Sequence, residues 1–236
     1  MSIAGPESYR VGSPPPPERL QLAGGAGDIE ALVESPAGAP RAVALCCHPH
    51  PLYGGTLTNK VIHTVARCFV AAGAVAVRFN FRGVGSSAGV HDEGRGETED
   101  VQRIAAWARS RWPGLPLWLG GFSFGSWVAL RAQSAAIGAG ERLRPELLVT
   151  VAPPVGRWDF STIEAPACPW LVVQGQRDEL VDARAVEEWM HALASSAADR
   201  SLVKLAEADH FFHGRLHELR DAVTGFVAAA APPRGS

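Results

Sequence analysis

The amino-acid sequence predicts an α/β fold in which helices cover both faces of a mostly parallel sheet. Short apolar runs alternate along the chain with longer segments whose apolar residues have helical spacing. Several of the short runs, such as RAVALCC at residues 41–47, are apolar throughout, as expected for strands that are covered on both faces. The helical segments lie between these runs, where the crossover connections of a parallel sheet belong.

The expected elements follow one another in a regular order. Residues 18–24 and 28–35 alternate in character, so we expect an antiparallel pair at the start of the sheet. The first helical segment ends before Gly73, a favourable C-cap, and the second has acidic residues in its first turn and arginines near its end. Further strands are expected at residues 41–47, 74–81, 115–121, 146–154, 169–175 and 201–208. Helices are expected at residues 59–72, 97–111, 124–137, 183–198 and 216–229.

The chain has the length of a single domain. Its 236 residues fit one domain with a full core, and no repeat or long linker divides them. Residues 1–17 are expected to form a flexible leader, because the four consecutive prolines at 14–17 favour an extended, solvated path. Residues 231–236 are expected to form a flexible tail. The predicted domain therefore spans residues 18–230.

Charge and composition argue against several classes of function. The net charge of −2 and the pI of about 6.4 lack the basic excess of a general nucleic-acid-binding protein. No segment approaches the roughly 20 apolar residues of a membrane span, and no basic amphipathic stripe indicates a membrane surface. The four cysteines are few, and two of them are adjacent, which favours reduced thiols. Because the N-terminus also lacks the pattern of a secretory signal, we expect a cytoplasmic protein.

The sharpest functional signal is the G-x-S-x-G motif at residues 121–125. The motif is weak alone, but here an apolar strand precedes it and a helix follows directly. In this setting the serine lies on a strained turn with its hydroxyl exposed, so Ser123 is the candidate nucleophile. Side chains at Gly121 and Gly125 would collide as strand and helix close on each other, and the N–H of Phe124 would supply half of an oxyanion hole. The alternative is a glycine-rich turn that contains an incidental serine.

A nucleophilic serine needs a base, and the base needs an orienting carboxylate. Asp178 follows the strand at 169–175, and His210 follows the strand at 201–208, so both are expected at the edge of the sheet where Ser123 lies. The order serine, aspartate, histidine along the chain is the order expected for this type of hydrolase. Three separate placements therefore agree on a Ser–His–Asp triad.

Other polar side chains compete for these roles. Glu179 and Asp182 lie near the candidate aspartate and are expected to be surface charges. His213 lies beyond the end of the last strand and is expected to be solvated. Asp209 is adjacent to His210, so its carboxylate would have difficulty reaching the far side of that imidazole ring.

The chain resembles the α/β-hydrolases, and within them small bacterial serine hydrolases that carry an HPHP-x-x-GG segment after the third strand. The matching segments are HPHPLYGG (48–55), FNFRGVGSS (79–87), GGFSFGS (120–126), QGQRDELV (174–181) and DHFF (209–212). The resemblance implies an eight-stranded sheet, a Ser–His–Asp triad and esterase or thioesterase-like activity.

The connection after the sixth strand is too short for a cap domain. GRWDFSTIEAPAC is the segment that lies between the strands ending near Pro154 and beginning near Pro169, and a dozen or so residues form only a short flap. We therefore expect an open site without a large cap, lined by apolar side chains that suit small esters or acyl thioesters. The candidates for this acyl pocket are Tyr53, Trp158 and Phe160, with Phe122 and Phe124, and core packing is an equally good explanation for Phe122.

The segment CCHPHPLYGG at residues 46–55 has the composition of a metal site but a different predicted role. Cys46 and Cys47 are adjacent in a buried strand, so they face opposite sides of the sheet and are poorly placed to share one ion. In α/β-hydrolases the loop after this strand supplies the second oxyanion donor. Prolines 49 and 51 have no N–H, so the N–H of Leu52 or His50 is favoured, with the Tyr53 hydroxyl as an outside candidate. His48 and His50 are expected to orient the loop through side-chain hydrogen bonds.

Two further segments have structural explanations. The glycines at 83, 85 and 89 are one residue off a dinucleotide fingerprint, and no helix opens there, so residues 82–87 are expected to form a turn at the rim of the site. HDEGRGETED at 91–100 lacks regular ligand spacing and is expected to be a solvated loop that leads into a helix. We expect no metal and no cofactor.

The sequence thus predicts a serine hydrolase that cleaves carboxylic esters or thioesters through an acyl-enzyme on Ser123, with a small-molecule substrate. Three alternatives stay open at this point. The first is an acyltransferase or a peptidase that uses the same triad. The second is a non-catalytic ligand-binding module on this fold, and the third is metal-dependent hydrolysis. The complete set of three residues argues against the binding module, since such a module need not retain them.

Overall fold

The computed structural model describes residues 13–134, 136–137, 141–193 and 199–231. Most of the predicted leader (1–17) and of the predicted tail (231–236) lies outside these ranges, so the predicted domain boundaries stay predictions. Within these ranges, no helix has both the length and the apolar character that crossing a membrane requires.

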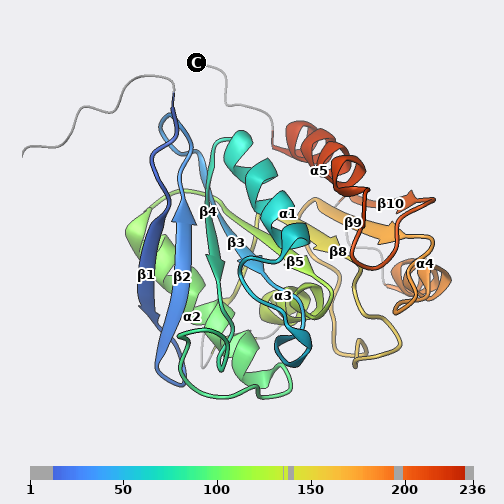
Figure 1. Ribbon diagram of the computed structural model, residues 1–236, viewed down its shortest axis with the longest axis horizontal. Coiled ribbons are helices and arrows are strands. Elements are labelled where there is room, and N and C mark those ends of the chain that lie inside the picture. The colour runs from blue at the N-terminus through green and yellow to red at the C-terminus, as the bar shows by residue number, and fades with distance from the viewer. Residues whose placement is uncertain (1–12, 135, 138–140, 194–198, 232–236) are drawn as a thin grey trace, which may run out of the picture.

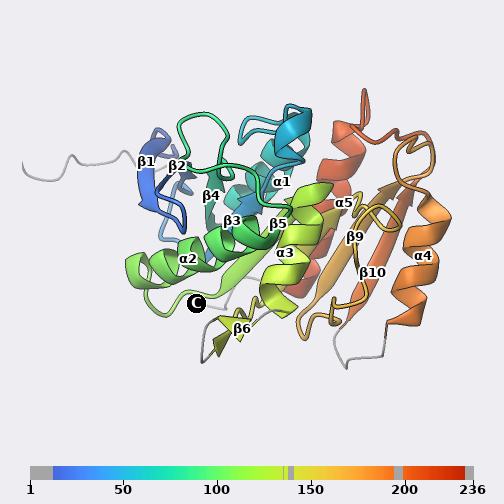
Figure 2. The same ribbon diagram turned by 90° about the horizontal axis from the view of Figure 1, so that it is seen from below.

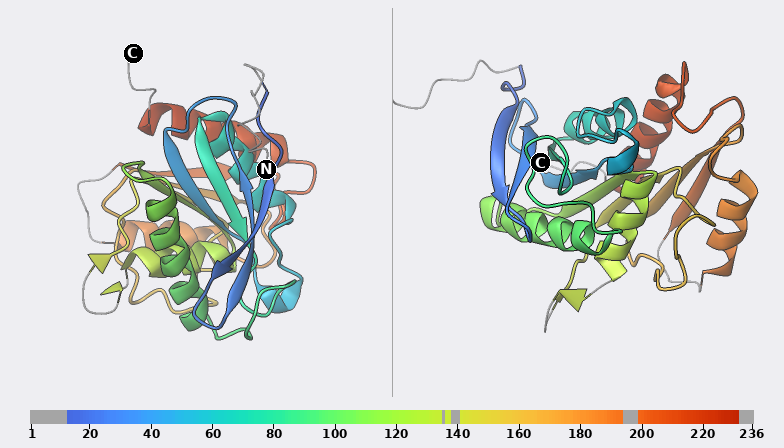
Figure 3. Two further views of the ribbon diagram at one scale, coloured as in Figure 1. Left: turned by 90° about the vertical axis from the view of Figure 1, so that its left-hand side faces the viewer. Right: turned by 60° about the horizontal axis from the view of Figure 1, so that its bottom comes forward.

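Eight strands form one twisted sheet, which is parallel except at one edge (Figures 1 and 3). β1 pairs antiparallel with β2, β2 pairs antiparallel with β4, and the other pairings in this sheet are parallel. These findings confirm the predicted class, the opening antiparallel pair and the eight strands. The spatial order is β1 (Glu18–Ala23), β2 (Asp28–Glu34), β4 (Ala74–Phe79), β3 (Ala42–Cys47), β5 (Leu117–Phe122), β8 (Leu147–Val151), β9 (Trp170–Gly175) and β10 (Arg200–Leu205).

Helices cover both faces of the sheet (Figure 2). α1 (Lys60–Ala71) and α5 (Leu216–Ala230) pack on one face, and α2 (Arg95–Arg111), α3 (Phe124–Ser134) and α4 (Ala183–Ala192) pack on the other. Cys46 lies in the core beneath α1 and α5, whereas Cys47 lies in the core beneath α2 and α3. The two adjacent thiols thus face opposite sides of the sheet, as predicted.

The observed helices differ from the predicted ones at their ends. The helix predicted to end at residue 137 ends at Ser134, because residues 136–137 instead form β6 (Ala136–Ile137), which pairs with β7 (Glu141–Arg142). α2 begins two residues before the predicted position, at Arg95, because Glu97 accepts the N–H of Gly94 and so closes the first turn. α4 ends at Ala192, and most of the rest of its predicted range, up to residue 198, lies outside the described residues.

Three strands stop earlier than their apolar sequences suggest. β4 ends at Phe79, β8 at Val151 and β10 at Leu205, two or three residues before the predicted ends. The N–H groups of Asn80 and Ala152 still donate to neighbouring strands, but the pairing stops one residue later: the N–H of Phe81 donates to a histidine side chain, and Pro153 has no N–H at all. At the carboxyl edge of the sheet the chain therefore leaves the strands early to form the loops around Ser123.

Candidate active site

Ser123 lies on a sharp turn between β5 and α3. Its backbone φ is +52°, a left-handed value that costs free energy for a residue other than glycine. The N–H of Ser123 donates to the Val151 carbonyl at 2.8 Å, and the Ser126 hydroxyl reaches the carbonyls of Gly121 and Val151 at 2.8 Å each. The turn is thus held against the neighbouring strand β8, which keeps the strained serine in place.

The two glycines of the motif allow a close approach that no side chain would permit. A Cβ atom at Gly121 would collide with the backbone of Gly125 and Ser126. A Cβ atom at Gly125 would collide with the carbonyl groups of Cys47 and His48, at the end of β3. The collision expected from the motif is therefore confirmed, and the start of α3 lies directly against the loop that follows β3.

His210 lies within hydrogen-bonding distance of the serine. Its Nε2 is 3.0 Å from the Ser123 Oγ, and its ring packs against Phe122 at a centroid distance of 5.2 Å. The side chain is almost fully buried, and the main-chain N–H of His210 donates to the Glu179 carboxylate at 3.3 Å. Glu179 is exposed, as expected for a surface charge, and it also helps to position the loop that carries His210.

Asp178 completes the chain of hydrogen bonds. Its Oδ2 accepts from His210 Nδ1 at 2.8 Å and from Gln174 Nε2 at 3.0 Å, and its Oδ1 accepts from the N–H groups of Leu180 and Val181 at 2.8 and 2.7 Å. Four donors therefore hold a fully buried carboxylate in one orientation. Gln174 was missed by the sequence analysis, although a single amide in the apolar strand WLVVQG was a usable signal.

The competing polar residues have other partners. Asp209 accepts from His213 Nδ1 at 2.7 Å and from the His213 N–H at 2.9 Å, so these two residues pair with each other rather than with His210. Asp182 accepts from the Arg184 N–H at 2.9 Å and caps α4. The structure therefore brings together the three residues that the sequence singled out, Ser123, Asp178 and His210.

The loop after β3 is held by both of its histidines, as the sequence suggested. His48 is buried, its Nε2 accepts the N–H of Phe81 at 2.9 Å, and its Nδ1 lies 2.6 Å from the Pro49 carbonyl. His50 Nδ1 accepts the N–H of Leu52 at 3.2 Å and so caps the short 3₁₀ turn η1 (Pro51–Tyr53). Burial lowers the pKa of His48 to about 4 and also lowers the pKa of His50, so both acceptors stay neutral near pH 7.

Most main-chain N–H groups of this loop are already used. The N–H of Leu52 donates to the His50 side chain, and the N–H groups of Tyr53 and Gly55 donate to the His50 carbonyl at 3.1 and 3.0 Å. Within the described part of the chain, the main-chain N–H groups of His50 and Phe124 have no hydrogen-bond acceptor. Of the two favoured donors in this loop, His50 has a free N–H and Leu52 does not.

The cysteine- and histidine-rich segment does not assemble a metal site. Cys46 and Cys47 belong to opposite cores, and both ring nitrogens of His48 already have partners. Burial raises the pKa of both thiols well above its usual value, which disfavours the thiolate that binds metal. Nowhere in the described ranges do three or more His, Cys, Asp or Glu side chains group as metal ligands would.

Aromatic rings line one side of the site. The His50 ring contacts Tyr53, Phe124 and Trp158 at centroid distances of 4.7, 4.8 and 5.5 Å. Tyr53 is 86% exposed and Trp158 is half-buried, so these two predicted pocket residues border open space. Phe160 is different: it is buried and packs against Trp189 of α4 at 4.8 Å, so it belongs to the core and not to the predicted pocket.

The connections around the site match two further expectations. Residues 155–169, between β8 and β9, contain no helix, so no cap domain covers Ser123. A buried bidentate salt bridge attaches the turn at 82–87 to α2: Arg82 donates to both carboxylate oxygens of Asp100, at 2.7 Å each. That segment is therefore a structural turn, as predicted.

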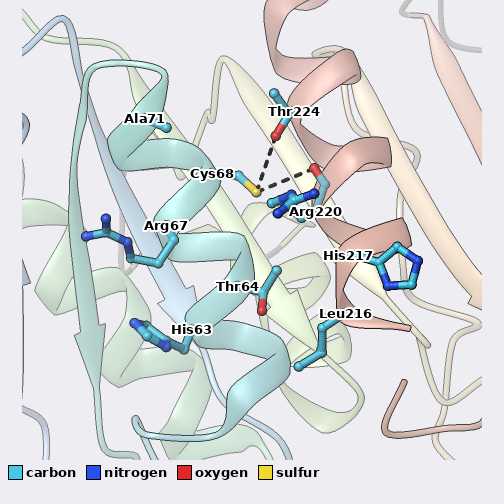
Figure 4. A pocket seen from close by; sticks show the side chains of 9 residues that line it. All are labelled: His63, Thr64, Arg67, Cys68, Ala71, Leu216, His217, Arg220 and Thr224. Carbon is cyan, nitrogen blue, oxygen red and sulfur yellow. Dashed lines mark hydrogen bonds between the residues drawn. The ribbon is translucent and has the colours of Figure 1, made fainter. Parts of the chain in front are cut away.

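A separate hollow of about 460 Å³ lies between α1 and α5 (Figure 4). The Cys68 thiol in its wall donates to the Arg220 carbonyl at 3.7 Å and accepts from the Thr224 hydroxyl at 3.6 Å. The nine residues that line it include none of the predicted site residues. This hollow is thus a surface feature between two helices and distinct from the candidate active site.

Comparisons with known proteins support a hydrolase. No protein-family model matches the chain. The uncharacterized protein RP471 of Rickettsia prowazekii is 32% identical over 217 residues, which are 89% of this chain and 88% of that protein. The chain is similar to the solved structure of XC6422 from Xanthomonas campestris, an α/β serine hydrolase without a lid (40% identity, TM-score 0.83, 93% of this chain and 97% of that one). It is also similar to an α/β serine hydrolase homologue from Coxiella burnetii (38% identity, TM-score 0.80, 88% and 96%).

The neutral, buried His48 predicts a loss of stability in mild acid. Its pKa is about 4 in the folded protein and 6.5 when exposed, so between these values only the unfolded chain binds the proton. The free energy of unfolding should therefore fall as the pH drops from about 6.5 to about 4, by up to about 1.4 kcal/mol per pH unit from this group. Urea denaturation at several pH values measures this slope.

His48→Gln is the matched variant for that experiment. The glutamine amide oxygen can replace Nε2 as the acceptor for the N–H of Phe81, but it does not titrate. The variant should show a shallower fall in stability over the same window, since all other titrating groups are shared. If the free energy of unfolding falls equally with pH in the wild-type protein and in His48→Gln, protonation of His48 is not the cause of the lost stability.

Proposed function

The chain belongs to the α/β-hydrolase superfamily, and on this premise we propose that it is a serine hydrolase that cleaves carboxylic ester or thioester bonds. The observation that carries the proposal is the unbroken chain of hydrogen bonds from Ser123 Oγ through His210 to Asp178, with distances of 3.0 and 2.8 Å. The strained serine at the carboxyl edge of the sheet supports the same assignment.

In the proposed reaction, His210 removes the proton from Ser123 as Oγ attacks the acyl carbon. Asp178 holds the imidazole in the tautomer that leaves Nε2 free, and its negative charge stabilises the imidazolium that forms. His210 then gives the proton to the departing alcohol or thiol, which leaves the acyl group on Ser123. A water molecule, activated by His210 in the same way, releases the acid and restores the serine.

We assign the oxyanion hole to the N–H groups of Phe124 and His50. Both N–H groups have no partner in the described part of the chain. The start of α3 lies against the carbonyl groups of Cys47 and His48, just before His50, and the rings of His50 and Phe124 are in contact. Leu52, the other candidate, uses its N–H to cap the loop. Two fixed N–H groups stabilise the negative charge that develops on the carbonyl oxygen in the transition state.

The aromatic surface next to these donors suits an apolar acyl group. Tyr53 and Trp158 present exposed ring surface beside His50, and no cap covers them. We propose a small-molecule ester or thioester as the substrate, with Tyr53 and Trp158 along its acyl part. The four buried, unpaired thiols also fit a reducing compartment, which supports a cytoplasmic location.

Active-site labelling and turnover test the assignment of the nucleophile. A fluorophosphonate should label Ser123, and p-nitrophenyl esters or acyl thioesters should be hydrolysed. Ser123→Ala should abolish labelling and lower kcat by about 10⁴-fold or more, because the covalent route is lost. Absence of labelling together with absence of turnover on both panels would exclude the proposal. Product diverted to an added alcohol or amine would instead indicate acyl transfer.

The side chain of His50 should matter for the oxyanion donor because it holds the loop. His50→Ala keeps the N–H but removes the acceptor for Leu52, so we expect kcat to fall about tenfold or more. In His50→Asn the amide oxygen takes the place of Nδ1 and should restore most of kcat. Steady-state kinetics of the three proteins measure this, with thermal melting as the folding control. Equal kcat values for the alanine and asparagine variants would show that the hydrogen bond from Leu52 to the His50 side chain does not contribute to catalysis.

A further inference from the structure

A second histidine–carboxylate pair lies beside the proposed oxyanion loop, and the proposed reaction does not use it. His91 Nδ1 is 3.0 Å from the Glu97 carboxylate, which is fully buried and also accepts the N–H groups of Asp92 and Gly94 at 2.9 and 2.8 Å. The His91 side chain is only 6% exposed. The arrangement has the same form as His210 with Asp178, in that a buried carboxylate holds Nδ1 and orients the ring.

The other nitrogen of His91 has no hydrogen-bond partner in the described part of the chain. Nε2 is buried, and the Glu93 carboxylate, at 3.7 Å, is close enough for an ion pair with a charged ring but too far for a hydrogen bond. A buried polar atom without a partner costs about 1–3 kcal/mol. The hydrogen bond that attaches His91 to Glu97 of α2 uses only Nδ1. A purely structural role for His91 therefore does not explain why Nε2 is buried without a hydrogen-bond partner. With the Nδ1 proton donated in a hydrogen bond to the Glu97 carboxylate, a ring that carries no second proton presents Nε2 as a hydrogen-bond acceptor.

The position of His91 connects it to the acyl side of the site. Its ring lies 4.7 Å from the ring of His50 and 5.5 Å from the ring of Phe124, the two residues that supply the proposed oxyanion donors. The leaving group must lie at His210, which gives it a proton, so the acyl group extends away from His210. We place the acyl group along the neighbouring rings of His50 and Trp158, and the ring of His91 lies against that of His50.

We propose that His91, oriented by Glu97, accepts a hydrogen bond from a hydroxyl group on the acyl part of the substrate. This inference rests on the proposed function and narrows its substrate class to esters or thioesters of hydroxylated carboxylic acids. The Glu93 carboxylate lies 3.7 Å from Nε2 and its side chain is 68% exposed, and the proposal requires this side chain to rotate away from the nitrogen. The aromatic rings contact the carbon skeleton, and His91 recognises the hydroxyl.

Pairs of esters that differ only in one hydroxyl group test this proposal. Ethyl hexanoate is compared with a series of ethyl hydroxyhexanoates in which the hydroxyl moves along the chain. At the carbon that reaches His91, kcat/KM should exceed that of the plain ester by about tenfold. His91→Phe keeps a ring against His50 and leaves Glu97 two main-chain donors, so the variant should fold. It should lose most of the preference, with the effect mainly in KM.

Two controls separate the possible outcomes. His217→Phe, a matched change at an exposed histidine of α5, should keep the preference for the hydroxylated ester. In Ser123→Ala, which retains His91, the hydroxylated ester should bind about tenfold more tightly than the plain one by calorimetry, and this holds even if His91→Phe fails to fold. Turnover of all the esters with equal kcat/KM, or equal binding, would overturn this inference alone. No turnover and no labelling of Ser123 would overturn the proposed function instead.

Discussion

The site depends on one close contact between backbone segments that are far apart in the sequence. Because Gly125 has no side chain, the start of α3 lies directly against the carbonyl groups at the end of β3. This contact brings Ser123, which belongs to the β5–α3 turn, next to the loop at residues 48–55. Any side chain at position 125 would separate the proposed nucleophile from the proposed His50 donor, so the proposed oxyanion hole exists only because both elements meet at this glycine.

Around that contact, nearly every buried polar group has a partner. Four donors hold Asp178, two partners hold His48, and the Ser126 hydroxyl bridges two strands of the sheet. Such saturation keeps the residues of the proposed triad in one geometry, which would lower the reorganisation needed in the transition state of the proposed reaction. Three buried side-chain atoms in the described residues lack a hydrogen-bond partner, namely Gln174 Oε1, Trp189 Nε1 and His91 Nε2, and the last of them lies beside the His50 ring.

Elements with strong local signals were predicted well. The G-x-S-x-G turn, the apolar parallel strands and the placement of Asp178 and His210 after two strands all follow from local pattern and chain order. Strand and helix ends were less accurate because long-range partners decide them: Phe81 gives its N–H to His48, and Ala136 pairs with Arg142. Phe160 was misplaced for a related reason, since only packing shows that it contacts Trp189 in the core and does not line the predicted acyl pocket.

The sequence by itself determined the α/β class, the order of its elements and the identity of the three residues proposed to react. Periodicity, glycine spacing and chain order depend on neighbouring residues, so they can be read from the chain. Only the tertiary structure decided which loop N–H is free, that Gln174 supports Asp178, and that His91 and Glu97 lie beside His50. These are contacts between side chains on separate loops, and their distances depend on how the whole sheet packs.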